Sequence, residues 1–194
     1  MAYAPIGRLE VIAGPMFAGK TEELIRRVRR AAIAGRRVQV FSHGIDQRSR
    51  PGMLGSHAGI EFPSQPVSSA VELRDAVAAD TEVVAIDEAQ FFGPDLVPLT
   101  ADMAGRGIDV LVAGLDVTFE GEPFAPLPAL MALAERVDKL TAICTVCGAE
   151  AVFHQRVTPR TAGAERVTDE HIGGLGKYEA RCRRHFEPSE GVPA

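Results

Sequence analysis

The fold is decided by one stretch, Gly14-Pro15-Met16-Phe17-Ala18-Gly19-Lys20-Thr21, which has the spacing G-x-x-x-x-G-K-T of a phosphate-binding loop. It follows an apolar run that ends at Ala13 and precedes a helical pattern from Thr21 to about Ala34. The glycines allow backbone N–H groups to converge on phosphate oxygens, and the N-terminus of the following helix adds a partial positive charge. Lys20 would contact the β- and γ-phosphates, and the Thr21 hydroxyl would bind Mg²⁺. We therefore predict a nucleoside-triphosphate site rather than a chance match in a glycine-rich turn.

Apolar patterns along the chain alternate between strands and helices. Short apolar runs predict strands at 8–13, 38–41, 82–86, 108–113 and 139–143. Helical spacing predicts helices at 21–34, from Ser68 or Ser69 to about 79, at 94–105 and at 128–137. This alternation predicts a parallel α/β sheet with right-handed connections.

Two features are expected to lie at the surface. Segment 42–65 is predicted to be an irregular loop with room for a short hairpin, and its His43 and His57 are expected to be surface or turn residues. Four arginines of the first helix lie mostly off its apolar stripe, which predicts a solvated face. They are Arg26, Arg27, Arg29 and Arg30.

A pair of carboxylates, Asp87 and Glu88, directly follows the predicted strand 82–86. In phosphate-loop enzymes we expect such a strand to lie beside the loop strand, with its first Asp on Mg²⁺, usually through water. The next carboxylate can accept a proton from the attacking nucleophile. A strand that ends in Asp-Glu is common by chance, so the pair is informative only in combination with the phosphate loop.

A second candidate region runs from Gly114 to Phe124 at the carboxyl end of the strand 108–113. Open α/β sheets bind their ligands at this edge. Phe119 and Phe124, which stand near glycines, could form the walls of a site for a flat ring. They could equally be ordinary core aromatics under a loop, and the residue types do not decide between the two interpretations.

The last part of the chain carries two ligand pairs with the same two-residue gap, Cys144 with Cys147 and Cys182 with His185. Four such ligands suit tetrahedral Zn²⁺ with no open position for chemistry. A redox Cys-x-x-Cys pair is the alternative, but it explains neither Cys182 nor His185. If His185 is incidental, three thiolates remain with an outside ligand, and two histidines without paired spacing are the candidates: His154 and His171.

The segment 156–176 between the two pairs is rich in Thr, Gly and charged residues and has no periodicity. A stretch of this kind in a compact domain is usually functional or disordered. Because the predicted zinc would tie its two ends together, we expect a lid.

Composition excludes several classes of protein. The chain of 194 residues suits one domain, or one domain with a small appendage. A net charge of −5 argues against a general nucleic-acid binder, which needs a basic surface. No apolar run approaches the length of a membrane span, and no signal peptide is evident at the N-terminus. We therefore expect a cytoplasmic protein with neither nucleic-acid nor membrane partners.

Six further motifs follow the phosphate loop in order: Asp46-x-Arg48, Ser56-His57-x-Gly59, Ile86-Asp-Glu-Ala-Gln-Phe-Phe92, Gly114-Leu-Asp-x-Thr-Phe119, Cys144-x-x-Cys147-Gly148 and Ile172-Gly-Gly-x-x-x-Tyr178-x-x-x-Cys182. The ordered set resembles the zinc-containing type II thymidine kinases of the human cytosolic and bacterial sort. The resemblance spans about Gly7 to His185. It implies a RecA-like phosphate-loop core, which we expect at 1–140, and a small zinc-binding domain with a lasso-type lid at 141–194.

The resemblance also implies an activity. Such enzymes transfer the γ-phosphoryl group of ATP to the 5′-hydroxyl of thymidine or deoxyuridine, which gives dTMP or its deoxyuridine counterpart in nucleotide salvage. The implied cofactors are structural Zn²⁺ and Mg²⁺ with ATP. The implied partners are ATP, thymidine, further copies of the chain in a homotetramer, and dTTP as a feedback inhibitor.

Residue by residue, the resemblance implies that Glu88 is the general base. Residues implied at ATP and its phosphates are Gly14, Pro15, Met16, Phe17, Ala18, Gly19, Lys20, Thr21, Asp46, Arg48, Asp87 and Gln90. Those implied around thymidine are Met16, Phe91, Leu115, Phe119, Phe124, Tyr178 and the lasso residues Asp169, Glu170, His171, Ile172 and Gly173. The implied metal ligands are Cys144, Cys147, Cys182 and His185 for zinc, and Thr21 and Asp87 for magnesium.

The chain departs from the family pattern at two of these places. The family tends to have Lys-Pro before the Asp-x-Arg loop, where this chain has Ser42, His43 and Gly44. His185 stands where the human-like branch has Cys.

Two other classes of function remain open on sequence alone. In a phosphate-loop ATPase, Glu88 would activate water instead of a nucleoside hydroxyl. In a zinc- and nucleotide-binding interaction module, no base would be needed, and the presence of Lys20, Thr21, Asp87 and Glu88 together argues against that class.

Overall fold

A computed structural model describes residues 6–44, 52–55, 61–157 and 177–188 of the chain. The strands of its main sheet are β1 (Leu9–Gly14), β2 (Val38–His43), β5 (Gln65–Val67), β6 (Val83–Ile86), β7 (Asp109–Leu115) and β8 (Arg136–Lys139). The α-helices are α1 (Lys20–Ile33), α2 (Ala70–Ala76), α3 (Leu96–Gly105) and α4 (Leu127–Leu133). Within the described ranges, none of the helices has the length and apolar character needed to cross a membrane.

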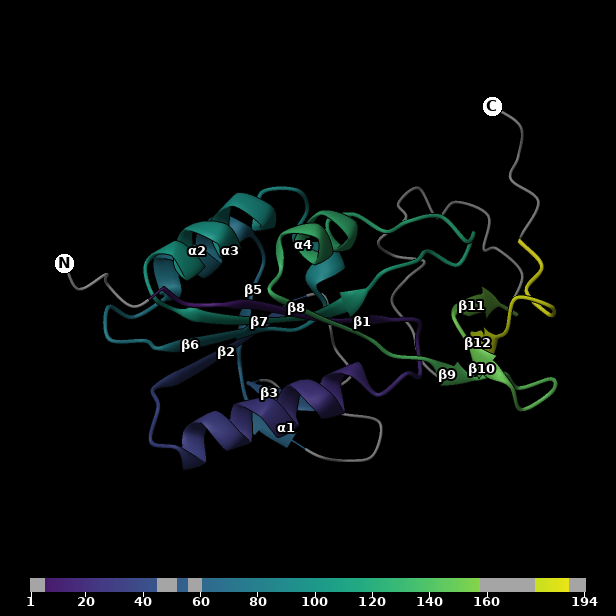
Figure 1. Cartoon of the computed structure of the whole chain (residues 1–194), viewed down its shortest axis with the longest axis horizontal. Coiled ribbons are helices and arrows are strands. Elements are labelled where there is room, and N and C mark those ends of the chain that lie inside the picture. Colours follow the sequence, from purple (N-terminus) through teal and green to yellow (C-terminus); the bar gives the residue numbers. More distant parts are fainter. Residues whose placement is uncertain (1–5, 45–51, 56–60, 158–176, 189–194) are drawn as a thin grey trace.

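The six strands pair in parallel in the order β5-β2-β6-β7-β1-β8. Helix α1 covers one face of the sheet, and α2, α3 and α4 cover the other (Figure 1). Successive residues of a strand point to opposite faces. Val11 therefore packs in the apolar layer under α2 to α4, while Ile12 packs with Leu24 and Ile25 under α1. This arrangement confirms the predicted α/β class.

Strand β6, which carries Asp87 at its end, does not lie beside the loop strand β1 as expected. Strand β7 pairs with both and separates them. The seven residues of β7 are almost all buried, as an apolar run in the centre of a parallel sheet should be. Because all three strands run in parallel, their carboxyl ends still meet at one edge of the sheet.

The predicted helix 128–137 is too long at its C-terminus. Helix α4 ends at Leu133, and β8 begins at Arg136. Between them Glu135 turns toward β1: its N–H donates to the Leu9 carbonyl at 3.0 Å, and its carboxylate accepts the Leu9 N–H at 2.7 Å. Pairing with β1 therefore overrides the helical spacing. The predicted strand 139–143 is divided in consequence, because Lys139 ends β8 and Ala142–Ile143 forms β9 in another sheet.

Helix α2 begins where predicted and ends early. The Ser69 hydroxyl caps the helix by accepting the Glu72 N–H at 3.1 Å, and the Glu72 carboxylate accepts the N–H of Ser68, one residue before the N-cap, at 2.7 Å. The helix ends at Ala76 rather than near residue 79. The Gln39 side chain of β2 bonds to the Ala76 carbonyl and the Ala78 N–H, so a tertiary contact replaces the next helical bonds.

Part of segment 42–65 forms the short hairpin that was expected, with β3 (Met53–Gly55) antiparallel to β4 (Glu61–Pro63). The placement of His43 at the surface was wrong. Strand β2 continues to His43, which pairs with Val67 of β5 and is only 9% exposed. Its ring packs edge-on against Phe92 with centroids 4.9 Å apart. His57 lies outside the described residues.

A small unit follows β8 at one end of the molecule (Figure 1). Strand β9 pairs with β10 (Glu150–Ala151), and β11 (Phe153–Arg156) pairs with β12 (Tyr178–Arg181), both antiparallel. The apolar core cluster of this unit consists of Ala142, Cys144, Ala151, Ala180 and Cys182. Phe17 and Ala18 of the phosphate loop pack against them.

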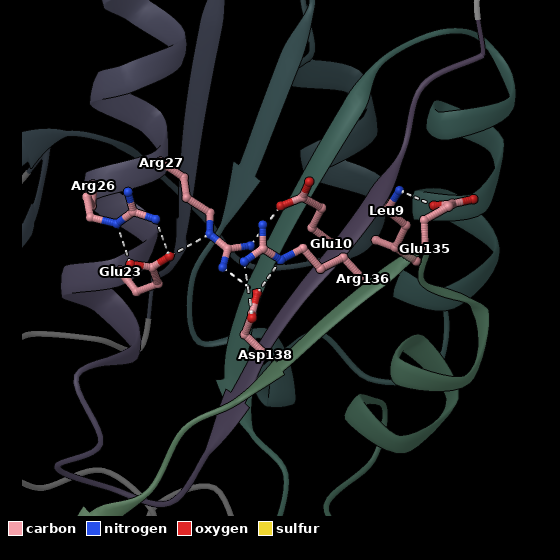
Figure 2. A network of polar contacts seen from close by, with 8 residues as sticks. All are labelled: Leu9, Glu10, Glu23, Arg26, Arg27, Glu135, Arg136 and Asp138. Carbon is pink, nitrogen blue, oxygen red and sulfur yellow. Dashed lines mark hydrogen bonds and ion pairs between the residues drawn. The ribbon is translucent and has the colours of Figure 1, made fainter.

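One arginine of α1 does not belong to the solvated face predicted for it. The Arg27 side chain is 8% exposed and reaches three carboxylates: Glu10 at 2.7 Å, Glu23 at 2.8 Å and Asp138 at 2.5 Å. Glu10 lies on β1 and Asp138 on β8, so Arg27 ties α1 to both strands (Figure 2). The side chain of Arg26, the residue before Arg27, is 55% exposed, as expected for the outer face.

Candidate active site

The phosphate loop begins at the carboxyl end of β1 and leads into α1. Gly14 has φ 151°, and a Cβ there would lie 2.5 Å from the Leu140 carbonyl oxygen. Gly19 has φ 82° at the N-cap of α1, and its carbonyl accepts the Glu23 N–H at 3.0 Å. Both positions therefore need glycine, one for space and backbone angle and the other for a left-handed cap. Helix α1 begins directly after the loop, and the N-terminus of a helix in this position is an arrangement that binds phosphate.

Two loop side chains are already oriented. Lys20 Nζ donates to the Pro15 carbonyl at 2.7 Å and so folds back across the loop. Thr21 Oγ1 donates to Asp87 Oδ2 at 2.8 Å. Asp87 is 1% exposed, and its N–H is held by the Phe41 carbonyl at 2.9 Å. The structure thus brings together the two residues whose oxygens were predicted to serve magnesium.

Glu88 follows Asp87 in an uncommon backbone conformation, with φ 53° and ψ 42°. It forms the N-cap of a short 3₁₀ helix, η1 (Ala89–Phe91). Left-handed conformations are costly for side chains other than glycine and concentrate at functional sites. The Glu88 carboxylate accepts a hydrogen bond from Gln90 Nε2 at 2.5 Å. The Gln90 side chain, two residues further along the chain, therefore holds the carboxylate of the predicted base.

Residues predicted to surround a flat ring are partly assembled. Phe119 and Tyr178 are 3% and 2% exposed, and their ring centroids lie 6.1 Å apart. Leu115 is buried and pairs in register with Gly14, so it lies beside the start of the phosphate loop. Met16, Phe91 and Phe124 are half-buried.

The segment after β7 is a closed turn. Val117 and Pro123 form an isolated antiparallel bridge, and the Thr118 N–H donates to the Glu122 carbonyl at 2.8 Å. The buried Asp116 carboxylate lies 2.7 Å from Lys139 Nζ at the end of β8. This turn places Phe119 against β12 and fixes one side of the candidate site.

Seven of the predicted site residues lie outside the described part of the chain. They are Asp46, Arg48, Asp169, Glu170, His171, Ile172 and Gly173.

The four predicted zinc ligands form one cluster. Their donor atoms, Sγ of Cys144, Cys147 and Cys182 and a ring nitrogen of His185, all lie within 4.8 Å of one another. The Cys147 and Cys182 sulfurs are 3.7 Å apart. Zn–S bonds of about 2.3 Å at tetrahedral angles place two sulfurs about 3.8 Å apart, so the donor set fits zinc.

The cluster also explains why a redox pair is the poorer interpretation. His185 Nδ1 lies 3.4 Å from Cys182 Sγ and 3.7 Å from Cys144 Sγ, so both halves of the sequence pattern converge on one point. Burial would raise the pKa of Cys144, but hydrogen bonds from the backbones of Cys182, Val146 and Cys147 and from His185 lower it to about 5. A thiol of this kind ionises readily, as a metal ligand must.

His154 was expected only as a spare metal ligand. Among the described residues it is not part of the cluster: it is fully buried, and its ring lies 5.8 Å from that of Tyr178. It stands on β11 opposite Ala180 of β12. A single histidine in a polar stretch gives no signal of such a position, which depends on how the two strands pair.

Thr21 of the phosphate loop bonds to the Asp87 carboxylate, and a second carboxylate directly follows; this is the arrangement of phosphate-loop α/β enzymes that act on nucleoside triphosphates. Within that class the family model for thymidine kinase matches residues 7–186. The chain belongs to this family and is therefore a kinase.

Named relatives agree with this assignment. A thymidine kinase of Bdellovibrio bacteriovorus is 46% identical over 187 residues, which cover 96% of this chain and 89% of the relative. A thymidine kinase of Deinococcus deserti is 47% identical over 192 residues, covering 92% of this chain and 94% of the relative. The predicted resemblance to bacterial type II thymidine kinases is confirmed.

Proposed function

We propose that this chain transfers the γ-phosphoryl group of ATP to the 5′-hydroxyl of thymidine or deoxyuridine, and so produces a nucleoside monophosphate for salvage. Family membership supports thymidine and ATP as the substrates. The observation that carries the proposal is the contact between Thr21 and Asp87 directly beside Glu88. Phosphoryl transfer needs a metal position, a phosphate cradle and a group that takes the acceptor proton, and the residues that we assign to these roles share one edge of the sheet.

The phosphates of ATP would lie over the loop from Gly14 to Thr21. Thr21 and Asp87 would hold Mg²⁺, Asp87 through water, and the ion when bound would neutralise charge on the phosphate oxygens. Lys20 would exchange its bond to the Pro15 carbonyl for one to a phosphate oxygen. The loop N–H groups and Lys20 would then stabilise charge on the transferring group, which is the main catalytic contribution in this chemistry.

Glu88 would act as the general base on the 5′-hydroxyl. It directly follows Asp87, which we assign to the metal, and its carboxylate would accept the proton of the attacking hydroxyl. A positioned base contributes about 10²–10⁴-fold to a rate. The alternative role of Glu88, activation of water, would give only slow background hydrolysis of ATP.

The nucleoside would be held on the side of Phe119 and Tyr178. Met16, Phe91, Leu115 and Phe124 complete the set that we assign to this pocket. We propose that the lasso residues 169–173 close over the base and that Asp46 and Arg48 approach the phosphates; both segments lie outside the described residues.

We propose that the cluster of Cys144, Cys147, Cys182 and His185 binds one structural zinc ion. The supporting observation is the tetrahedral spacing of its donors. We divide the chain accordingly into a nucleotide-binding unit, 1–140, and a zinc-binding unit, 141–194, which carries the lasso.

Three further properties are inferred from the family alone. We propose a cytoplasmic homotetramer that dTTP inhibits by binding in place of substrates. Light scattering coupled to size exclusion measures the assembly, and a mass of a single chain would overturn the tetramer. Inhibition by dTTP that thymidine relieves competitively is the expected kinetic result, and the absence of inhibition would remove dTTP from the proposal.

The proposal is tested by ADP release with three additions: no nucleoside, thymidine, and 5′-deoxythymidine, which lacks the attacking hydroxyl. We expect thymidine alone to accelerate ADP release, with one monophosphate formed per ADP. Equal ADP release in all three would identify an ATPase and sink the kinase proposal. Zinc content, measured on the same preparation by metal analysis, should be one ion per chain.

A further inference from the structure

Gln90 makes two hydrogen bonds that join different parts of the candidate site. Its Oε1 accepts the backbone N–H of Leu115 at 3.0 Å, and its Nε2 donates to Glu88 Oε2 at 2.5 Å. Gln90 is 5% exposed, so water does not compete freely for either bond. The side chain thus connects the end of β7 to the carboxylate that we assign as the base.

The orientation of this amide is determined by its surroundings. A backbone N–H can only donate, so the Gln90 atom that faces Leu115 must be the oxygen. The NH₂ group then points toward Glu88 Oε2, which accepts its hydrogen bond.

Gly114 leaves the space that the amide occupies. A Cβ at this position would lie 2.8 Å from Gln90 Oε1, 3.0 Å from a Leu127 methyl carbon and 3.3 Å from the Ala89 Cβ. The first two distances are shorter than side chains normally tolerate. Gly114 lies in a regular strand, so the requirement for glycine here comes from packing and not from an unusual backbone angle.

Glu88 is the residue that most needs such support. Its left-handed backbone carries a conformational cost, and such conformations persist only where the surroundings hold them. The 3₁₀ turn η1 begins directly after it and carries Gln90 in its centre. The amide therefore closes the turn back onto the residue that starts it.

We propose that Gln90 is a positioning residue for Glu88. Its amide is fixed by Leu115 and accommodated by Gly114, and it holds the Glu88 carboxylate in the orientation needed to accept the proton of the 5′-hydroxyl. This proposal rests on the kinase function proposed above and goes beyond a phosphate contact for Gln90. Because β7 continues from Leu115 into the turn that carries Phe119, Gln90 also fixes the base relative to one wall of the nucleoside site.

The test is a double-mutant cycle between Gln90→Met and Glu88→Gln, read as initial rates of monophosphate formation. We expect Gln90→Met to lower kcat on the order of tenfold while KM for ATP and thymidine change less than about twofold, because the change acts through the base. In the Glu88→Gln background the same change should alter kcat by less than about twofold, since the base is already lost.

The matched control is Gln39→Met, the same replacement at the other end of the sheet. Gln39 also bonds to a backbone N–H and to a side chain, at Ala78 and Thr81. Its loss should lower the midpoint of thermal unfolding and leave kcat unchanged. If Gln90→Met unfolds the chain, Gly114→Ala serves instead: it should lower kcat in the wild type, because it displaces the amide.

Each outcome decides the matter. An unchanged kcat with a raised KM for ATP would make Gln90 a phosphate contact and overturn the proposal. If Gln90→Met lowers kcat by the same factor in the wild type and in the Glu88→Gln background, Gln90 acts independently of the base. This result would also overturn the proposal. If the wild type forms monophosphate and Gln90→Met is equally active, the role of Gln90 is overturned while the proposed function stands. A wild type that forms no monophosphate would overturn the proposed function and this inference together.

Discussion

Glu88 illustrates what the sequence can and cannot predict about a single residue. Its place after a buried strand follows from the apolar run 83–86, which marks where the strand must end. Its positive φ and its bond to Gln90 depend on how the turn η1 packs under β7, and no local residue type signals either. His43 shows the same limit, because its burial results from pairing with β5 rather than from its own polarity.

The backbone strain at Glu88 predicts a difference between two otherwise similar variants. A left-handed conformation costs a residue with a Cβ about 1–2 kcal/mol, and glycine is spared most of this cost. We expect Glu88→Gly to unfold in urea with a free energy about 1 kcal/mol greater than that of Glu88→Ala. Both variants lack the carboxylate, so their difference isolates the backbone. A less stable Glu88→Gly would show that the conformation carries no strain.

His43 predicts a pH dependence of stability. Burial lowers the pKa of His43 below its usual value of 6.5, although hydrogen bonding at the Ser68 backbone and the charge of Glu72 oppose the shift. The unfolded chain therefore binds a proton at a higher pH than the folded chain does. The free energy of unfolding should be constant above pH 6.5 and should fall as the pH drops below it. Urea titrations from pH 7.5 to 5 measure this slope, and His43→Phe should reduce it; an identical slope in the variant would exclude His43 as its source.

At the scale of elements, Arg27 on α1 shows why one helix face was mispredicted. The helical stripe correctly identified Leu24, Ile25 and Val28 as core residues. Arg27 borders that stripe, and only the pairing of β8 with β1 brings Asp138 and Glu10 beneath it. The contact partners come from segments far apart in the sequence, so the spacing along α1 could not reveal them (Figure 2).

Arg27 and Arg26 form a matched pair for a stability test, because both bind Glu23. Removing one partner of a buried ion pair costs roughly 3–5 kcal/mol, and we expect Arg27→Met to lose about 3 kcal/mol because its carboxylates keep some contact with water. Arg26→Met removes an exposed pair and should cost much less than Arg27→Met. Equal losses in urea denaturation would contradict the role assigned to Arg27 in holding α1 on the sheet.

Part of the loss of stability at low pH is also expected to come from helix α1. Hydrogen bonding to Arg26, and then to Arg27, lowers the pKa of Glu23 from 4.5 to about 2 despite the opposing effect of burial. The contribution of Glu23 is therefore fully present above about pH 4.5 and is lost as the pH falls toward 2. Glu23→Gln should flatten the stability profile over this window, and an unchanged profile would exclude Glu23 as a main contributor.

At the scale of the whole molecule, the unit that carries the proposed zinc cluster is in contact with the phosphate loop. The cysteine spacing was enough to predict the cluster, since four ligands in two pairs have few other uses. The packing of Phe17 and Ala18 on the buried core of that unit was not predictable, because it joins the first and last parts of the chain. Zinc bound at the proposed cluster would therefore act on the proposed ATP site through the packing of Phe17 and Ala18.

This contact predicts an effect of Cys147→Ser on nucleotide binding. The variant should lose zinc, loosen the packing around Phe17 and raise KM for ATP roughly tenfold, which corresponds to about 1.4 kcal/mol. Val146→Ser in the same knuckle removes an exposed apolar side chain and should keep both zinc and KM. A zinc-free Cys147→Ser with unchanged KM for ATP would show that the phosphate loop does not depend on the metal.

We propose that Glu88 directs phosphoryl transfer from ATP to a nucleoside hydroxyl, and the fate of the label from [γ-³²P]ATP measures this step itself. With thymidine present, the wild type should place the label on thymidine monophosphate, and Glu88→Gln should do so at least roughly 10²-fold more slowly while it still binds ATP. Label that appears mainly as inorganic phosphate would contradict transfer to the nucleoside. Transfer by Glu88→Gln at the wild-type rate would contradict the assignment of Glu88 as the base.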